Sequence, residues 1–172
     1  MKPVQGNNTD KPLLDAGYLS APLHSLDSVP HRSMEAFKGK FERTSEVQYD
    51  DFLKALGLNA LMRAAATAST PKLEISEEDG QWVTENSTIL KKLTLRFELG
   101  REFDYKTLDG RNTKTTITFQ DGKIVSKQKA TKEGETSSTT FMEMNGPDEL
   151  IYTLTVDEID NVKCVQKFKR IA

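Results

Sequence analysis

The side chains that most often carry catalysis are few in this chain and widely separated. The two histidines, His24 and His31, lie in the first part of the sequence, and the single cysteine, Cys164, lies near its end. The paired carboxylates of Asp50 and Asp51 fall on a predicted surface. Neither a metal-ligand spacing nor a glycine-rich phosphate loop is present. The sequence therefore predicts a binding protein without metal or cofactor, and not an enzyme.

Composition and charge limit the classes of partner. Lysine and arginine total 24 residues against 26 acidic residues, for a net charge of -2, whereas a nucleic-acid-binding domain is usually markedly basic. No apolar run approaches the roughly 18 residues that cross a bilayer, and the first residues contain no apolar signal-peptide core. We therefore predict a cytoplasmic protein that binds no nucleic acid.

Residues 1–34 differ in composition from the rest of the chain. Four of the six prolines occur there, and the apolar residues follow no sustained period of two or of 3.6. This composition predicts a flexible, disordered N-terminal extension, with the folded domain occupying residues 35–172. As an alternative, the extension binds a partner or docks on the domain, and Leu13-Leu14 and Tyr18-Leu19 would then be its anchors.

Two short helices follow the first predicted strand of the domain. Phe52, Leu53 and Leu56 recur at helical spacing, and a second run of the same kind lies between Gly57 and Pro71. Gly57 indicates a tight turn between the two helices, and Pro71 marks the end of the second one.

After Pro71 the sequence has turn signals at regular intervals. Dipeptides that end in glycine supply the backbone conformation of tight hairpins. They occur at Asp79-Gly80, Leu99-Gly100, Asp109-Gly110, Asp121-Gly122, Glu133-Gly134 and Asn145-Gly146. Short segments of period-two alternation lie between them, as in residues 93–99. This spacing predicts antiparallel strands in an up-and-down arrangement.

Such a long series of strands must protect its edges, and closure into a barrel does so completely. The first strand, near residues 38–46, can pair with the last, near residues 161–170. The two helices would then lie between the first and second strands and cover an open end. The sequence therefore predicts an all-β protein, a barrel with a small helical lid.

This organisation resembles the intracellular lipid-binding protein family, which comprises fatty-acid-binding proteins and cellular retinoid-binding proteins. The likeness covers about residues 36–172, and the order and spacing of its segments make it specific. The segments are GKF at 39–41, YDDFLKALG at 49–57, FELGREFD at 97–104, DGR at 109–111, DGKIV at 121–125 and CVQKFKR at 164–170. Two residues depart from the first-strand signature of the family. Arg43 replaces an aliphatic residue, and Gln48 stands where Asn, His or Gly is usual.

The resemblance implies a ten-stranded antiparallel up-and-down β-barrel of the calycin type, with a helix-turn-helix lid. It also implies that a monomer without cofactor binds and transports a long-chain fatty acid or similar hydrophobic ligand in an internal cavity. Each buried methylene contributes about 0.8 kcal/mol, and the polar end of the ligand needs partners. In such proteins the lid can also touch anionic membranes, so the resemblance allows transient membrane contact, and a solvated helix face is the favoured alternative.

The last strand departs from the usual fatty-acid site. In the family an arginine and a tyrosine there hold a ligand carboxylate, and the corresponding residues are Gln166 and Phe168. Alternation places both on the inward face, because Lys163, Lys167 and Lys169 occupy the other face. The pair resembles the retinol-binding branch, so a carrier of a neutral lipid such as retinol is the alternative. In an equally weighted alternative, Gln166 is an interior residue whose hydrogen bonds are satisfied within the protein, and the head group of the ligand binds elsewhere.

A second arginine of the family's site corresponds to Glu143 if the strand is aligned from Leu150 without a gap. An inward Glu143 would repel a carboxylate ligand, and it would be protonated or paired with a cation such as Arg111. A shift of one residue at the 145–147 turn would instead bury Met142 and expose Glu143. The sequence leaves both registers open.

Arg111 is a further polar candidate. In the family the matched arginine lies inside the cavity near its entrance, and a surface position beside the turn is the alternative. Thr115 shares its face of residues 111–119. The ligand-binding candidates besides Gln166, Phe168 and Glu143 belong to the lid and to the barrel interior. They are Tyr49, Phe52, Leu53, Phe97, Arg111 and Thr115.

Overall fold

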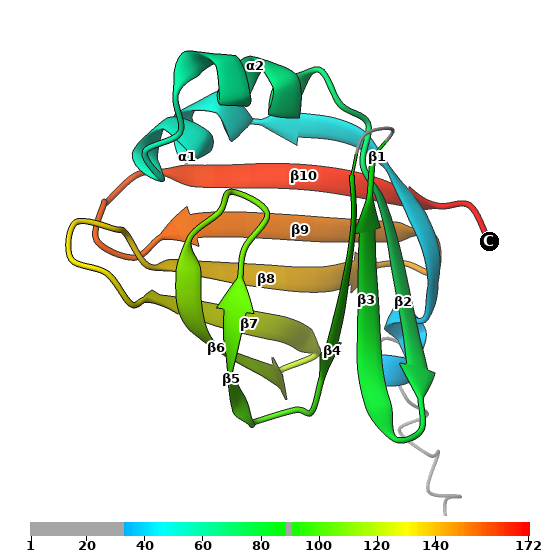
Figure 1. Cartoon of the computed structure of the whole chain (residues 1–172). Coiled ribbons are helices and arrows are strands. Elements are labelled where there is room, and N and C mark those ends of the chain that lie inside the picture. Colours follow the sequence, from blue (N-terminus) through cyan, green and yellow to red (C-terminus); the bar gives the residue numbers. More distant parts are fainter. Residues whose placement is uncertain (1–32, 89–90) are drawn as a thin grey trace, which may run out of the picture.

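The computed structural model describes residues 33–88 and 91–172 (Figure 1). The anchors proposed for the N-terminal extension lie outside the described residues. The elements are a 3-10 helix η1 (Met34–Phe37), β1 (Gly39–Val47), α1 (Tyr49–Ala55), α2 (Ala60–Thr67), β2 (Lys72–Glu78), β3 (Gln81–Ser87), β4 (Lys92–Phe97), β5 (Glu102–Lys106), β6 (Asn112–Gln120), β7 (Lys123–Ala130), β8 (Ser138–Asn145), β9 (Glu149–Val156) and β10 (Lys163–Arg170).

The ten strands form a single antiparallel sheet that curls into a nearly closed barrel. Its strand order is β4-β3-β2-β1-β10-β9-β8-β7-β6-β5. The first and last strands pair as the sequence predicts, with Phe41 opposite Arg170 and Val47 opposite Val165. The pairing shifts register between Arg43 and Ser45. Among the described residues β4 and β5, which end the strand order, are not paired with each other, so the closure is incomplete there.

The lid consists of α1 and α2, which connect β1 to β2 along the chain, as predicted (Figure 1). The chain enters α1 through Gln48, whose φ of 58° is left-handed. Asn59 caps α2, because its side chain accepts a hydrogen bond from the backbone nitrogen of Met62 at 2.9 Å. Phe52 and Leu53 of α1 are buried, whereas α2 buries no residue. The lid is therefore attached to the barrel mainly through α1.

The interior contains two apolar clusters. The smaller one lies beneath the lid and consists of Phe52, Leu53, Leu56, Val156 and Cys164. The larger one fills the opposite end of the barrel and consists of Met34, Phe37, Phe41, Leu73, Ile75, Phe97, Ile117, Ile124, Met142, Leu150 and Phe168. Because η1 contributes Met34 and Phe37 to this cluster, the 3-10 helix closes that end.

Arg170 holds the closed end together from the last strand. Its guanidinium donates to the carbonyl oxygens of Ala36, Lys38 and Pro147. The same group lies 4.5 Å from the ring centre of Phe41. η1 is therefore tied to β10 by hydrogen bonds as well as by apolar packing.

Candidate functional site

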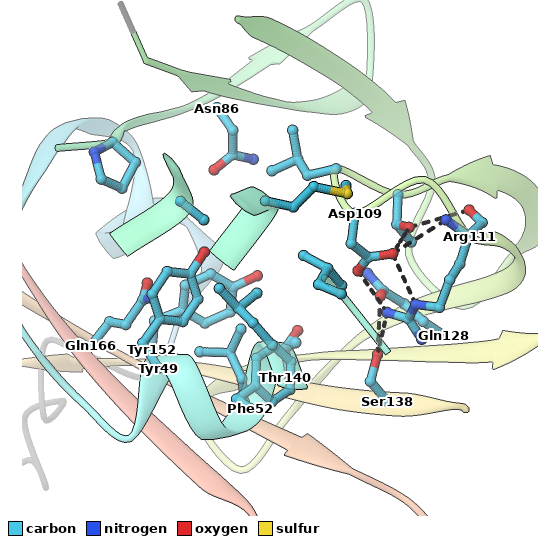
Figure 2. Close-up of a pocket in the computed structure, with 18 of the residues that line it drawn as sticks. Tyr49, Phe52, Asn86, Asp109, Arg111, Gln128, Ser138, Thr140, Tyr152 and Gln166 are labelled. Atoms are coloured by element: carbon cyan, nitrogen blue, oxygen red, sulfur yellow. Dashed lines mark hydrogen bonds and ion pairs between the residues drawn. The ribbon is translucent and has the colours of Figure 1, made fainter. Parts of the chain in front are cut away.

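A cavity of about 260 Å³ lies between the lid and the barrel wall (Figure 2). The lid and its connections contribute Tyr49, Phe52, Leu53, Leu58, Met62, Ala66 and Pro71. The barrel contributes Asn86, Tyr105, Thr107, Leu108, Asp109, Arg111, Gln128, Ser138, Thr140, Tyr152, Leu154, Gln166 and Phe168. In Figure 2, Tyr49, Tyr152 and Gln166 lie together on one side, and the group around Arg111 lies on the other.

Arg111 is held by a dense set of hydrogen bonds. Its Nε and Nη2 each lie 2.9 Å from one of the two carboxylate oxygens of Asp109. The guanidinium also donates to the carbonyl oxygen of Thr136 and, at 3.2 Å, to the hydroxyl of Ser138. The side chains of Arg111 and Asp109 are 6% and 12% exposed. A bidentate pair of this kind is among the stronger ion pairs in proteins.

Asp109 is ionised in this arrangement. Burial raises the pKa of its carboxyl group, but hydrogen bonds from Arg111 and Thr107 and the positive charge of Arg111 outweigh that effect. Its pKa therefore lies below the usual value of 3.8. Two opposite charges thus face each other within 3 Å at the cavity wall, and the wall carries no net charge there.

The β10 wall of the cavity is neutral. Gln166 and Phe168 point inward and are 4% and 3% exposed. Tyr152 of β9 is the pairing partner of Gln166, and its ring lies 6.2 Å from that of Phe168. Burial raises the pKa of the neighbouring Cys164 thiol to about 12, so this group stays protonated. The polar groups of this wall therefore offer hydrogen bonds without charge.

The tyrosine hydroxyls around the cavity are also neutral. Burial raises the pKa of Tyr105 to about 12 and raises the pKa of Tyr49 as well. Among the described residues that line the cavity, Asp109 is the only carboxylic acid and Arg111 the only basic side chain. The cavity as a whole therefore presents one internally paired charge and a set of neutral donors and acceptors.

Six of the nine candidates from the sequence line this cavity. They are Tyr49, Phe52, Leu53, Arg111, Gln166 and Phe168. Arg111 lies in the cavity wall and not on the outer surface beside its turn.

The inward position considered for Glu143 is wrong. Met142 is 9% exposed and belongs to the core, so the shifted register is the correct one. Glu143 lies opposite Lys123 of β7 on the outer face, and their charged atoms are 2.7 Å apart. The position of the family's second arginine is therefore not occupied by an inward acid in this chain.

Phe97 and Thr115 are buried but do not line the cavity. Phe97 is part of the cluster that fills the closed end. The hydroxyl of Thr115 lies 2.8 Å from that of Thr113 and is satisfied by it. Both side chains are inward as alternation predicts, but alternation gives the face of a strand and not the height along the barrel axis.

Several residues of the cavity wall are not among the candidates that the sequence predicts. The sequence marks Asp109 only as part of an Asp-Gly turn, although it is the partner of Arg111. Gln128, Ser138 and Tyr152 also line the cavity. Period-two alternation along β8 and β9 would have placed Ser138 and Tyr152 inward once Met142 had set the register.

Among residues 33–88 and 91–172 there is no group of three or more histidine, cysteine, aspartate or glutamate residues that could hold a metal ion. None of the helices in the described part of the chain is long and apolar enough to span a membrane.

Comparisons with known proteins agree with this geometry. Fatty acid-binding protein homolog 5 of Caenorhabditis elegans is 39% identical over 122 residues, which are 71% of this chain and 89% of that protein. Cellular retinoic acid-binding protein 2 of Mus musculus is 35% identical over 130 residues, 73% of this chain and 94% of that protein.

Solved structures and a family model extend the comparison. The Schistosoma mansoni fatty acid binding protein in complex with arachidonic acid matches with a TM-score of 0.73 and 26% identity, over 81% of this chain and 99% of that one. The model of the lipocalin / cytosolic fatty-acid binding protein family matches residues 38–171. The nearly closed ten-stranded barrel, its helical lid and these matches together place the chain in the lipocalin / cytosolic fatty-acid binding protein family.

Proposed function

We propose that the chain reversibly binds a long-chain hydrophobic ligand in the cavity beneath the lid and transports it. The observation that carries this proposal is the cavity itself, which has an apolar lid and a few polar groups in its walls. A hydrocarbon chain moved there from water contributes about 0.8 kcal/mol per methylene. The family and the fold are those of ligand-binding carriers, which supports binding over catalysis.

The site residues follow from the walls of the cavity. Tyr49, Phe52 and Leu53 of α1 would contact the hydrocarbon part of the ligand. Gln166 and Arg111 are the polar groups on opposite sides that could receive its head group. The cavity, at about 260 Å³, is slightly below the roughly 300–1,000 Å³ of typical ligand sites. We therefore expect the lid to move outward when a long ligand binds.

A fatty acid is the first candidate ligand. It is the ligand class in the names of the nematode relative and of the Schistosoma mansoni structure, and the latter contains arachidonic acid. In this chain a carboxylate would have to compete with Asp109 for Arg111, or accept hydrogen bonds from the Gln166 amide.

A lipid with a neutral head group is the second candidate. Gln166 and Phe168 carry no charge, and the charge of Arg111 is already paired with Asp109. A carboxylate buried without a cationic partner is costly, whereas a hydroxyl can both donate to and accept from an amide side chain. Retinol and long-chain alcohols belong to this class.

Displacement titration tests the proposed function. The purified full-length chain is saturated with a fluorescent fatty acid, and unlabelled lipids are added as competitors. We expect saturable binding at one site and complete displacement. Absence of saturable binding for fatty acids and for retinoids alike would contradict the carrier function.

The same titration separates the two candidates. Oleate and oleyl alcohol have the same hydrocarbon chain and differ only in the head group. Stronger displacement by oleate supports a fatty-acid carrier, and stronger displacement by oleyl alcohol or retinol supports a neutral ligand. Retinoic acid against retinol gives the matched comparison for a retinoid chain.

Membrane contact, monomeric state and cytoplasmic location stay predictions. On α2 the side chains of Leu61 and Met62 are 80% and 45% exposed. An apolar surface on the lid supports transient contact with a membrane during ligand transfer. Binding of the chain to anionic lipid vesicles, measured by cosedimentation, tests this expectation.

A further inference from the structure

Arg43 of β1 is a buried cation that the cavity does not explain. Its side chain is only 7% exposed. Arg43 is not among the residues that line the cavity. A charge taken out of water at this place therefore needs another explanation.

The contacts of Arg43 connect the two ends of the lid with the barrel wall. Its Nη1 lies 2.6 Å from Oε2 of Glu46 near the end of β1. Its Nη2 donates to the carbonyl oxygen of Ser69, which lies between α2 and β2. The guanidinium carbon is 5.3 Å from the ring centre of Tyr49, the first residue of α1. We call the side chains of Arg43 and Glu46 with the carbonyl group of Ser69 the Arg43 bridge.

The backbone reinforces the same connection. The backbone nitrogen of Arg43 donates to the carbonyl oxygen of Pro71 at 3.1 Å, just before β2 begins. The register shift between β1 and β10 occurs directly after Arg43, and a shift of this kind bends a strand locally. The Arg43 bridge thus lies where the chain leaves the barrel for the lid and where it returns.

The C-terminal end of α2 has few other attachments among the described residues. Ala66 packs against the cluster beneath the lid, but no residue of α2 is buried. Arg63 bonds to Asp50 of α1 and to the carbonyl oxygen of Leu58, which ties α2 to the rest of the lid and not to the barrel. The Arg43 bridge is therefore the polar side-chain link from the barrel to this end of α2.

Stability alone is a weak reason for such a bridge. The desolvation of the buried guanidinium and the half-buried carboxylate offsets most of their attraction, and apolar side chains of similar volume often stabilise a fold equally well. The guanidinium differs from an aliphatic side chain in its planar set of donors, which can hold a carboxylate and a carbonyl oxygen at once. That property suits a contact that fixes one position of the lid.

We propose that Arg43 is a positioning residue that holds the end of α2 on the barrel and sets the rate of ligand exchange. Met62 and Ala66 line the cavity from α2, so release of the helix end uncovers the cavity. Because the Arg43 bridge does not line the cavity, its loss changes the rates of entry and exit by the same factor. The inference about ligand exchange rests on the proposed function, whereas the inference about the position of the lid does not.

Hydrogen exchange of the full-length chain without added lipid tests the position of the lid. The test variant carries Arg43→Leu with Glu46→Gln, so that no half-buried carboxylate is left unpaired. We expect the amides of α2 to exchange about tenfold faster, because the hydrogen bond from the guanidinium to the carbonyl oxygen of Ser69 is lost, while β6–β9 are unchanged. Arg96→Leu is the matched control, because Arg96 pairs with Glu78 on the exposed barrel surface.

Stopped-flow binding of a fluorescent fatty acid tests the exchange rates. In the double variant we expect association and dissociation to accelerate by about the same tenfold, with Kd changed by less than about twofold. Arg43→Lys keeps the charge but offers a single ammonium, so it should give an intermediate acceleration. A role in packing alone would change stability without this parallel change in the two rates.

Each remaining outcome decides the proposal. Unchanged exchange of α2 in a folded double variant overturns it, and so does a weaker Kd without faster exchange, since Arg43 would then act on the ligand. If the double variant does not fold, Arg43→Lys decides, and unchanged α2 exchange in that variant overturns the proposal. If the wild-type chain binds no probe, the proposed function fails, and hydrogen exchange still decides whether the Arg43 bridge positions the lid.

Discussion

At the scale of residues, the cavity is defined by how its few charges are paired. Arg111 would be an attractive partner for a carboxylate ligand, but Asp109 already binds it in bidentate fashion. On the opposite side Gln166 offers an amide without charge. One acidic residue in a turn thus neutralises the cation that the arginine alone would offer.

Replacement of Asp109 by Asn should lower the free energy of unfolding by about 3 kcal/mol at pH 7, because it leaves the buried Arg111 without a counter-charge. Urea unfolding measures this loss. Asp104→Asn is the control, since Asp104 pairs with Lys114 at the surface and should change stability by less than about 1 kcal/mol. Equal effects of the two variants would show that the buried pair does not stabilise the fold.

The effect of Asp109→Asn should depend on pH. The pKa of Asp109 is lowered in the folded protein, so its stabilising contribution is fully present above the unfolded value of 3.8 and is lost as the pH falls through the lower folded value. The stability difference between wild type and variant should therefore be constant near neutrality and shrink below about pH 3.8. A difference that grows on acidification would contradict the direction of the shift.

At the scale of elements, the two ends of the barrel are built differently. η1 and Arg170 close one end by apolar packing and by hydrogen bonds to three carbonyl groups. At the other end α2 buries no residue. The elements at the closed end should therefore be rigid, and the movement that admits a ligand should be found in the lid.

Gly39→Ala should destabilise the closed end by about 2–3 kcal/mol. Gly39 has a φ of 135°, and a Cβ there would lie 2.2 Å from Nη1 of Arg170 and 2.9 Å from the carbonyl oxygen of Ala172. Arg170 cannot move aside without losing its bonds to η1. Thermal unfolding measures the loss. Gly134→Ala is the matched control, because Gly134 also has a positive φ but open space around it, so only the backbone cost of about 1 kcal/mol should remain.

The strands and the lid could be predicted from sequence because local signals determine them. Asp79 and Gly80, with φ values of 52° and 78°, form the hairpin that their residue types favour. The loop between β9 and β10 has no Asp-Gly or Asn-Gly signal and uses Asn161 at a φ of 69° instead. η1 is not predicted by the sequence, because Met34 and Phe37 become core residues only when they pack against strands that are distant in the sequence.

The site was harder to predict than the fold because it depends on height along the barrel axis. Alternation placed Gln166 and Phe97 on inward faces, but only Gln166 reaches the cavity. The register of β8 depends on a turn that the sequence leaves open, so the sequence alone does not decide between an inward and an outward Glu143. The pairing of Arg111 with Asp109 connects side chains across a turn, and no periodic pattern reports such a contact.

At the scale of the whole molecule, the barrel is divided into a filled half and a half that contains the cavity. The larger apolar cluster fills one half and is closed by η1. The cavity lies in the other half, and all its lining residues fall between positions 49 and 168. The larger cluster and the cavity wall therefore share few residues, such as Phe168, and most changes in one half should leave the other intact.

Removal of residues 1–32 should leave ligand affinity unchanged, because the cavity and both apolar clusters are built from residues 34–168. The shortened chain keeps Met34 and Phe37, which the closed end needs. Displacement titration and thermal unfolding of the two chains give the comparison. A weaker affinity in the shortened chain would assign a binding role to residues 1–32 and contradict the domain division predicted from the sequence.

The division of the barrel also determines what the chain's intrinsic fluorescence reports. Trp82 is the only tryptophan of the chain; it packs against the larger cluster and has Nζ of Lys38 5.1 Å from its ring centre. Its emission thus depends on the integrity of the closed end, and Trp82 itself does not line the cavity. We therefore expect the tryptophan emission to report unfolding of the closed end more strongly than filling of the cavity.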